Sequence, residues 1–178
     1  METSLEKKDS PEGCRIVRLQ AEKAAIFVDA DACPVKSEIV EIANEYHFKT
    51  YFVASIAHKM NEPVWGEWFY VDSDKESADL FILNHAKLNN VVVTQDIGLA
   101  SMLLPKGVYV VSPRGIEFKE ESIETALNYR FAAAKARRQG KYGKGPKPFR
   151  DDDRARFKDS LTKILSNLAG DSDLLSKE

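Results

Sequence analysis

Four aspartates stand where an apolar run gives way to a loop or a helix. Asp29 and Asp31 follow one such run, Asp96 follows another, and Asp79 lies in the first turn of a predicted helix. Hard cations such as Mg²⁺ and Mn²⁺ prefer oxygen ligands, and a pair of them can clamp the attacking and leaving oxygens of phosphodiester hydrolysis. We therefore expect these four carboxylates to hold Mg²⁺ or Mn²⁺, and Asp29, Asp31 and Asp96 to act in catalysis.

The spacing of Asp29 and Asp31 is the most informative part of this pattern. In extended backbone, side chains two positions apart point to the same side, and two like charges there favour a cation between them. Pro34 follows, and Pro suits the first turn of a helix. The simpler interpretation is that one carboxylate only caps that helix. Capping is likewise the alternative for Asp96, and a charge at the positive end of a helix is the alternative for Asp79.

The elements that must position these side chains alternate between strand and helix. Strands are predicted from short runs of apolar and β-branched residues, and helices from apolar residues at helical spacing. This alternation predicts an α/β fold built from βαβ units, with a parallel sheet and right-handed crossovers. The predicted strands cover 24–29, 49–54, 67–71, 91–94 and 108–111, and the predicted helices cover 34–46, 78–88, 99–104, 120–139 and 151–168.

The composition sets the broad class of the protein. A chain of 178 residues suits one domain, and 43% of its residues are hydrophobic, which is enough for a core. No apolar run reaches the ~20 residues that span a bilayer, and the first residues lack the apolar region of a signal peptide. Cys14 and Cys33 have no metal-ligand spacing, so we expect a reducing, cytoplasmic location. Residues 1–22 are expected to form a partly disordered extension, and residues 170–178 a polar tail.

A basic segment offers a second kind of site. The net charge of the chain is only −2, yet residues 130–150 contain eight Lys and Arg and no acid. Cations interleaved with Tyr142 and Phe149 suit phosphate contact and base stacking, although such a run is often only a solvated helix face. Arg114, at the exit of the last predicted strand, could bind phosphate or form a salt bridge with one of the acids at the carboxyl-end rim of the sheet. We expect nucleic acid, RNA in particular, to contact Arg114, Arg130, Arg137, Arg138, Lys141, Lys144 and Lys147.

Five short motifs together resemble the YaiI/YqxD family of bacterial proteins. They are residues 28–35 (Val-Asp-Ala-Asp-Ala-Cys-Pro-Val), Ala78-Asp79, 94–100 (Thr-Gln-Asp-Ile-Gly-Leu-Ala), 112–115 (Ser-Pro-Arg-Gly) and 145–149 (Gly-Pro-Lys-Pro-Phe). The resemblance covers about residues 25–168. Two positions depart from it: Glu76 stands where many relatives carry Asp, and the loop over residues 55–58 lacks the Asn or Gln often found there. Neither departure removes one of the four aspartates.

The family is in turn similar to PIN-like domains, which are metal-dependent nucleases with an acidic site on a parallel sheet. This resemblance implies a three-layer core over residues 23–118, with a five-stranded sheet in the order 3-2-1-4-5. A C-terminal helical extension with a basic Gly/Pro-rich linker would follow over residues 119–169 and pack on the core. The implied order places the first and fourth strands side by side, so that Asp29 and Asp96 would face each other.

Three functions fit this pattern. The first is a metal-dependent nuclease that cleaves RNA or DNA at the acidic cluster. The second is a non-catalytic nucleic-acid-binding module of the same fold, which salt bridges that neutralise the acids would favour. The third is a phosphatase similar to the haloacid dehalogenases, in which the first Asp attacks phosphorus and the second is the general acid–base. Ala32 and Cys33, where those enzymes usually carry Thr or Val, count against the third.

Overall fold

The computed structural model describes residues 24–58, 65–74, 76–141, 143, 145 and 147–175, and for 171–175 it gives the course of the backbone alone. The predicted extension over residues 1–22, the last residues of the predicted tail (176–178) and Lys144 lie outside the described residues. Within the described ranges, no helix is long and apolar enough to cross a membrane.

A six-stranded sheet forms the centre of the fold. Its strands are β1 (Ala25–Asp29), β2 (Lys49–Ser55), β3 (Glu67–Val71), β4 (Val91–Val93), β5 (Tyr109–Val111) and β6 (Glu117–Phe118). They lie in the order β3-β2-β1-β4-β5-β6, and the first five are parallel. The order 3-2-1-4-5 is therefore confirmed, but the prediction of five strands is wrong, because β6 adds an antiparallel edge. A two-residue strand is too short to show any periodic pattern in the sequence.

The helices occupy the segments that the sequence predicts, with ends that differ by a few residues. They are α1 (Lys36–Glu45), α2 (Ser77–His85), α3 (Ile97–Leu103), α4 (Glu120–Arg138) and α5 (Asp151–Leu175), with short 3₁₀ helices η1 (Ile56–His58) and η2 (Leu104–Lys106). The largest difference is at α5, which continues through residues predicted as tail. A single glycine such as Gly170 costs a helix only about 1 kcal/mol, so it does not end this one.

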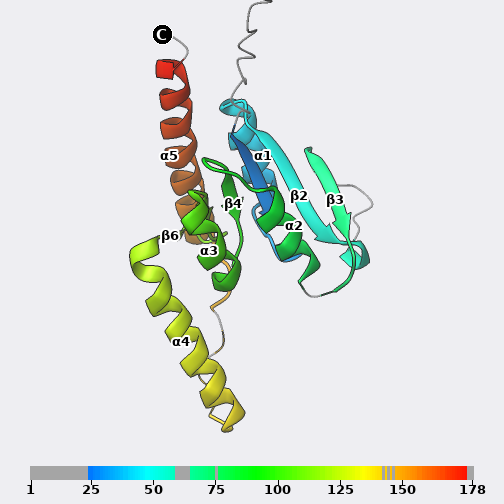
Figure 1. The fold of residues 1–178 in the computed structure, drawn as a ribbon, viewed down its shortest axis with the longest axis vertical. Helices are drawn as coiled ribbons and strands as arrows, with labels where there is room; N and C mark the ends of the chain where they lie inside the picture. The colour runs from blue at the N-terminus through cyan, green and yellow to red at the C-terminus, as the bar shows by residue number, and fades with distance from the viewer. Residues whose placement is uncertain are drawn as a thin grey trace, which may run out of the picture.

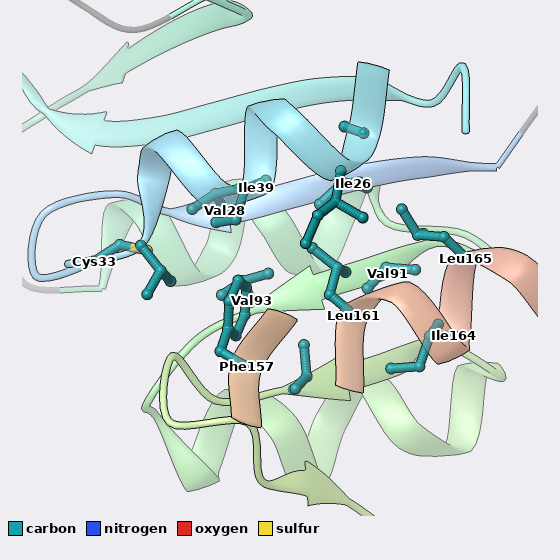
Figure 2. Packing of buried hydrophobic residues seen from close by; sticks show 14 of the residues in the cluster. Ile26, Val28, Cys33, Ile39, Val91, Val93, Phe157, Leu161, Ile164 and Leu165 are labelled. Atoms are coloured by element: carbon teal, nitrogen blue, oxygen red, sulfur yellow. The ribbon is translucent and has the colours of Figure 1, made fainter. Parts of the chain in front are cut away.

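The central strand β1 is buried on both faces, as its unbroken apolar run predicts. Ile26 and Val28 point to one face, where they pack with α1 and α5 (Figure 2). Phe27 points to the other face, which α2 and α3 cover. The sheet therefore lies between two layers of helices (Figure 1). Asp29 is the last residue of the buried strand β1.

The helix α5 is part of this core. Phe157, Leu161 and Leu165 are completely buried, and Ile164 and Leu168 complete the same face. These residues recur at intervals of three and four, which is the spacing of one helical face. The predicted apolar face of this helix is confirmed.

The helix α4 behaves differently, because none of its side chains is fully buried. Ile123 packs beside α3 and the sheet, but Tyr129 is 80% exposed and Phe131 is 69% exposed. Apolar residues at helical spacing predict this helix, but they do not form a fully buried face, and α4 extends away from the sheet (Figure 1). The basic half of α4 is consequently open to solvent.

Candidate functional site

The candidate site lies where β1 and β4 end side by side. Val28 of β1 is in register with Val93 of β4, so the chains leave the sheet together at Asp29 and Thr94. The Thr94 hydroxyl donates a hydrogen bond of 3.0 Å to Asp29 Oδ2. β1 leads to a helix on one face of the sheet and β4 to a helix on the other, and ligands of open α/β sheets bind at such a switch point.

Asp29 is held in a partly buried position at this rim. Burial raises the pKa of its carboxyl, and the nearby charges of Asp31 and Asp96 raise it further. The hydrogen bond from Thr94 and the charge of Lys36 act in the opposite direction without cancelling the rise. Asp29 is therefore an acid whose charge would be stabilised by an additional cation.

Asp31 turns to the other neighbour of β1. Its two oxygens accept hydrogen bonds of 3.0 and 3.2 Å from the backbone N–H of Ser55, at the end of β2, and Oδ1 lies 3.4 Å from His58 Nδ1. The extended backbone that the sequence prediction assumes for Asp29 and Asp31 is not formed, because β1 ends at Asp29 and Asp31 lies in a turn. The interpretation of either as a helix cap fails too, since α1 begins after Val35 without a side-chain cap.

Asp96 does cap a helix, as one interpretation of the sequence holds. Its Oδ1 accepts hydrogen bonds from the N–H groups of Gly98 at 2.6 Å and Leu99 at 3.1 Å, at the start of α3. Arg130 of α4 donates to the same oxygen at 3.0 Å and to Oδ2 at 3.4 Å. Burial acts to raise the pKa of Asp96, but the bonds from Arg130 and the helix outweigh it and lower that pKa.

Asp79 reaches the rim from the first turn of α2. Burial raises its pKa to about 6, and the charges of Asp96, Asp29 and Glu76 add to the rise, against the opposing charge of Arg130. No described residue donates a hydrogen bond to it. The N-cap of α2 is Glu76, which makes no side-chain capping bond. Of the four acids, Asp79 is the one whose negative charge is least balanced by hydrogen-bond donors and nearby cations.

Three of the four predicted acids thus act on one another electrostatically from three different elements, β1, α2 and α3. Among the residues that the structure describes, however, no three His, Cys, Asp or Glu side chains are grouped closely enough to hold a metal ion. The site is therefore not a closed metal cage. Its donor set fits a more open arrangement, because Mg²⁺ is often held by one or two carboxylates together with water and substrate phosphate.

Arg114 is engaged at a different place from the rim acids. Its guanidinium donates to Asp153 Oδ2 at 2.5 Å and to the carbonyl of Lys147 at 2.5 Å, and it lies 5.6 Å from the centre of the Phe149 ring. These contacts fasten the segment before α5 to the exit of β5. A phosphate would have to compete with them, and the phosphate role predicted for Arg114 stays a prediction.

The remaining basic candidates divide into one that touches the acids and several that do not. Arg137, Arg138, Lys141 and Lys147 are exposed. Arg130 is the described residue that joins this basic stretch to the rim, through its bond to Asp96. The sequence predicts Arg130 as a phosphate ligand, but no local signal shows that it pairs with Asp96.

Cys33 sits next to the site without features of a nucleophile. Its side chain is buried, and burial raises the pKa of its thiol to about 11. A thiolate is therefore scarce at neutral pH, and Cys33 packs as a small apolar residue of the core.

Comparison with known proteins adds a family to this geometry. Residues 27–167 match the family model described as "Uncharacterized BCR, YaiI/YqxD family". A UPF0178 protein of Bacillus cytotoxicus is 52% identical over 145 residues, covering 82% of this chain and 95% of that protein. A UPF0178 protein of Listeria monocytogenes is 51% identical over 142 residues, covering 80% and 95%.

A third relative, a UPF0178 protein of Bacillus velezensis, is 49% identical over 160 residues, covering 89% of this chain and 95% of that protein. No solved structure matches the chain. The family model spans β1 to α5 and so contains all four aspartates, Arg114 and Arg130. The chain belongs to the YaiI/YqxD family.

Proposed function

We propose that this protein hydrolyses phosphodiester bonds of nucleic acid, RNA or DNA, with Mg²⁺ or Mn²⁺ at the rim acids. The observation that carries the proposal is that the ends of β1 and β4 and the starts of α2 and α3 bring Asp29, Asp79 and Asp96 to one rim of the sheet. The raised pKa of Asp79, which comes from burial and from the charges of Asp96 and Asp29, agrees with this convergence. Perturbed pKa values of carboxyl groups cluster at functional sites. The strand order that places them together is also the order implied by the resemblance to PIN-like nucleases.

The rim residues would have the following roles in binding the cation and positioning the substrate. Asp29 and Asp79 supply the oxygens whose negative charge is least balanced by hydrogen-bond donors and cations. Asp96 adds Oδ2, the oxygen that does not accept from the N–H groups of the helix. Asp31 adds negative charge beside Asp29. A divalent cation, when bound, would neutralise charge on the phosphate and activate a water molecule as nucleophile. Thr94 donates to Oδ2 of Asp29 and so restrains the orientation of that carboxylate.

The basic face of α4 supplies the second requirement, a place for the nucleic-acid backbone. Its last turn carries Lys135, Arg137 and Arg138, and Arg130 connects it with the rim. Phosphate contacts of this kind give affinity without sequence preference. The exposed ring of Phe131, on the same helix, suits stacking with a base.

A non-catalytic nucleic-acid-binding module is the second candidate. The observation in its favour is that no three described side chains are grouped to hold a metal, together with the neutralisation of Asp96 by Arg130. In that case the basic helix would bind nucleic acid and the acids would only shape the loops around the rim.

The test is cleavage of a pool of single-stranded and structured RNA and DNA with Mn²⁺ or Mg²⁺. The wild type is compared with Asp29→Asn, with Asp79→Asn and with Asp159→Asn, a control that alters an exposed acid on α5. The proposal expects cation-dependent cleavage by the wild type and the control, and at least a hundredfold loss in the two rim variants. Equal cleavage by all four proteins would contradict it.

Two further outcomes identify the alternatives. Salt-sensitive binding without cleavage in any cation would favour the binding module. Release of phosphate from a phosphomonoester, with Asp29→Asn inactive and the nucleic acids intact, would favour a phosphatase in which Asp29 is the nucleophile.

A further inference from the structure

Arg130 forms a direct link between the basic helix α4 and the acids of the rim. Its Nη1 donates to Asp96 Oδ1 at 3.0 Å and its Nη2 to Oδ2 at 3.4 Å. Both side chains remain accessible, with 52% of the Arg130 side chain and 33% of the Asp96 side chain exposed. A ligand at the rim can therefore reach this ion pair, which a buried salt bridge would not permit.

The two carboxylate oxygens of Asp96 have different hydrogen-bond partners. Oδ1 is committed to the start of α3, where it accepts from Gly98 and Leu99. Oδ2 accepts only the longer contact from Arg130 among the described residues. If Arg130 moved away, the helix cap would hold the Asp96 side chain in place and Oδ2 would be left without its partner.

Gly98 leaves room for this contact. A Cβ atom at that position would lie 2.9 Å from Asp96 Oδ1 and 3.7 Å from Arg130 Nη1. Any other residue would therefore crowd the carboxylate on the side where the guanidinium binds. The arrangement of Gly98, Asp96 and Arg130 is a compact site for one planar cation.

We propose that Arg130 couples phosphate binding to cation binding at the rim: a phosphodiester group of the nucleic acid takes the guanidinium from Asp96, and the released Oδ2 then becomes available to the divalent cation. The inference rests on the proposed function and states how nucleic acid would regulate cation binding at the same site. Without nucleic acid, Arg130 itself neutralises Asp96 and competes with the cation. With nucleic acid, the same guanidinium neutralises the substrate instead.

The chemistry of the three groups supports this exchange. Exposed ion pairs contribute little net stability, so Arg130 can leave Asp96 at small cost. A guanidinium matches two oxygens of a phosphate as well as two oxygens of a carboxylate. Arg137 lies seven positions further along α4, two turns away and on the same side of the helix, where it can contact the next phosphates. Linkage then requires reciprocity: the cation must strengthen phosphate binding as much as phosphate strengthens cation binding.

The test is the affinity for Mn²⁺, measured by calorimetry without and with a short phosphorothioate oligonucleotide, which resists cleavage. The proteins are the wild type, Arg130→Ala, Arg130→Lys and, as control, Lys158→Ala. The control removes another exposed ion pair, that of Lys158 with Glu41, on the opposite helical layer.

Without oligonucleotide, Arg130→Ala should bind Mn²⁺ at least about fivefold more tightly than the wild type, the low end of typical coupling. The oligonucleotide should raise the affinity of the wild type by a similar factor and leave that of Arg130→Ala nearly unchanged. Arg130→Lys keeps the charge but not the two-pronged contact, so it should fall between them. Lys158→Ala should behave as the wild type does.

The outcomes separate this inference from the proposed function. Equal Mn²⁺ affinity of wild type and Arg130→Ala, abolished in both by adding Asp79→Asn, would overturn the coupling and leave the cation site standing. No Mn²⁺ binding by any of the proteins, with or without oligonucleotide, would overturn both. Weaker binding by Arg130→Ala would show that Arg130 supports the cation site and does not compete with it.

Discussion

Thr94 and Asp29 are 65 positions apart in the chain, and yet the Thr94 hydroxyl donates a hydrogen bond of 3.0 Å to Asp29 Oδ2. The same hydroxyl oxygen accepts a hydrogen bond of 3.0 Å from the backbone N–H of Asp96. One side chain, only 1% exposed, therefore orients two of the predicted catalytic acids. This relationship depends on β1 and β4 being neighbours, and it makes Thr94 a positioning residue of the rim.

Replacing Thr94 by Val should damage both stability and activity. Val keeps the shape but leaves Asp29 Oδ2 and the Asp96 N–H without their partner in a buried place, which costs about 1–3 kcal/mol. Thr94→Ser keeps the hydroxyl and serves as the matched control. Urea unfolding should show the loss for Val alone, and cation-dependent cleavage should fall at least tenfold for Val alone. If the two variants unfold at the same urea concentration, the hydroxyl does not have the role assigned here.

The pKa of Asp79 predicts a pH dependence of stability. Its carboxyl binds a proton more tightly in the folded protein, with a pKa of about 6, than in the unfolded chain, where the ordinary pKa of 3.8 applies. Between these pH values the folded state holds more protons than the unfolded state, so its stability falls as the pH rises. Asp79→Asn abolishes this titration, and the variant should match the wild type near pH 4.

At pH 7 the Asp79→Asn variant should be more stable than the wild type by about 1 kcal/mol, after allowance for solvent screening of a partly exposed group. Thermal or urea unfolding across pH 4 to 7 measures this difference, with Asp159→Asn as the control that should show none. A difference between wild type and Asp79→Asn that stays constant over this range would contradict the raised pKa.

The turn that carries Gly115 should tolerate no side chain. Gly115 has a φ of +75°, and a Cβ atom there would lie 2.5 Å from the carbonyl carbon of Arg156 and 2.6 Å from the nitrogen of Phe157. Both are backbone atoms of α5, which cannot move aside without separating that helix from the sheet. Gly115→Ala should therefore cost about 3 kcal/mol or more.

Gly140→Ala is the matched control for this prediction. Gly140 has nearly the same φ, +76°, but apart from its chain neighbours no described residue lies within 4 Å of the added Cβ. Only the left-handed backbone is then strained, at about 1–2 kcal/mol. Urea unfolding of the two variants separates strain from collision, and equal losses would mean that the turn at Gly115 does not press against α5.

The sequence predicts those parts of the fold that depend on local apolar pattern. The unbroken run in β1 and the three- and four-residue spacing of Phe157, Leu161 and Leu165 are properties of short segments, and both elements are confirmed. The grouping of Asp29 with Asp96 follows from the order of the strands, which the resemblance to a known family implies.

What the sequence does not predict depends on contacts between distant segments. Glu38 looks like a solvent-facing charge between apolar positions of α1, but it is only 8% exposed, because Arg154 of α5 pairs with it. Phe131 continues the apolar spacing of α4, but it is 69% exposed. The pairing of Arg130 with Asp96 likewise requires α4 to lie beside α3, and no residue near Arg130 in the chain signals that placement.

The exposed basic turn of α4 should set the salt dependence of nucleic-acid binding. Arg137 and Arg138 are exposed and lie in the last turn of α4, about two turns beyond Arg130, so their replacement should leave the cation site intact. Each cation that contacts a phosphate of a single strand changes the slope of log K against log salt by about 0.7. The double variant Arg137→Ala with Arg138→Ala should therefore flatten that slope by about 1.4, as measured by fluorescence anisotropy with a labelled oligonucleotide.

Lys158→Ala, which removes a cation from the opposite helical layer, should leave the slope as it is. If the slope is the same in all three proteins, the backbone of the nucleic acid does not follow α4, and the phosphate contacts must be sought elsewhere on the molecule.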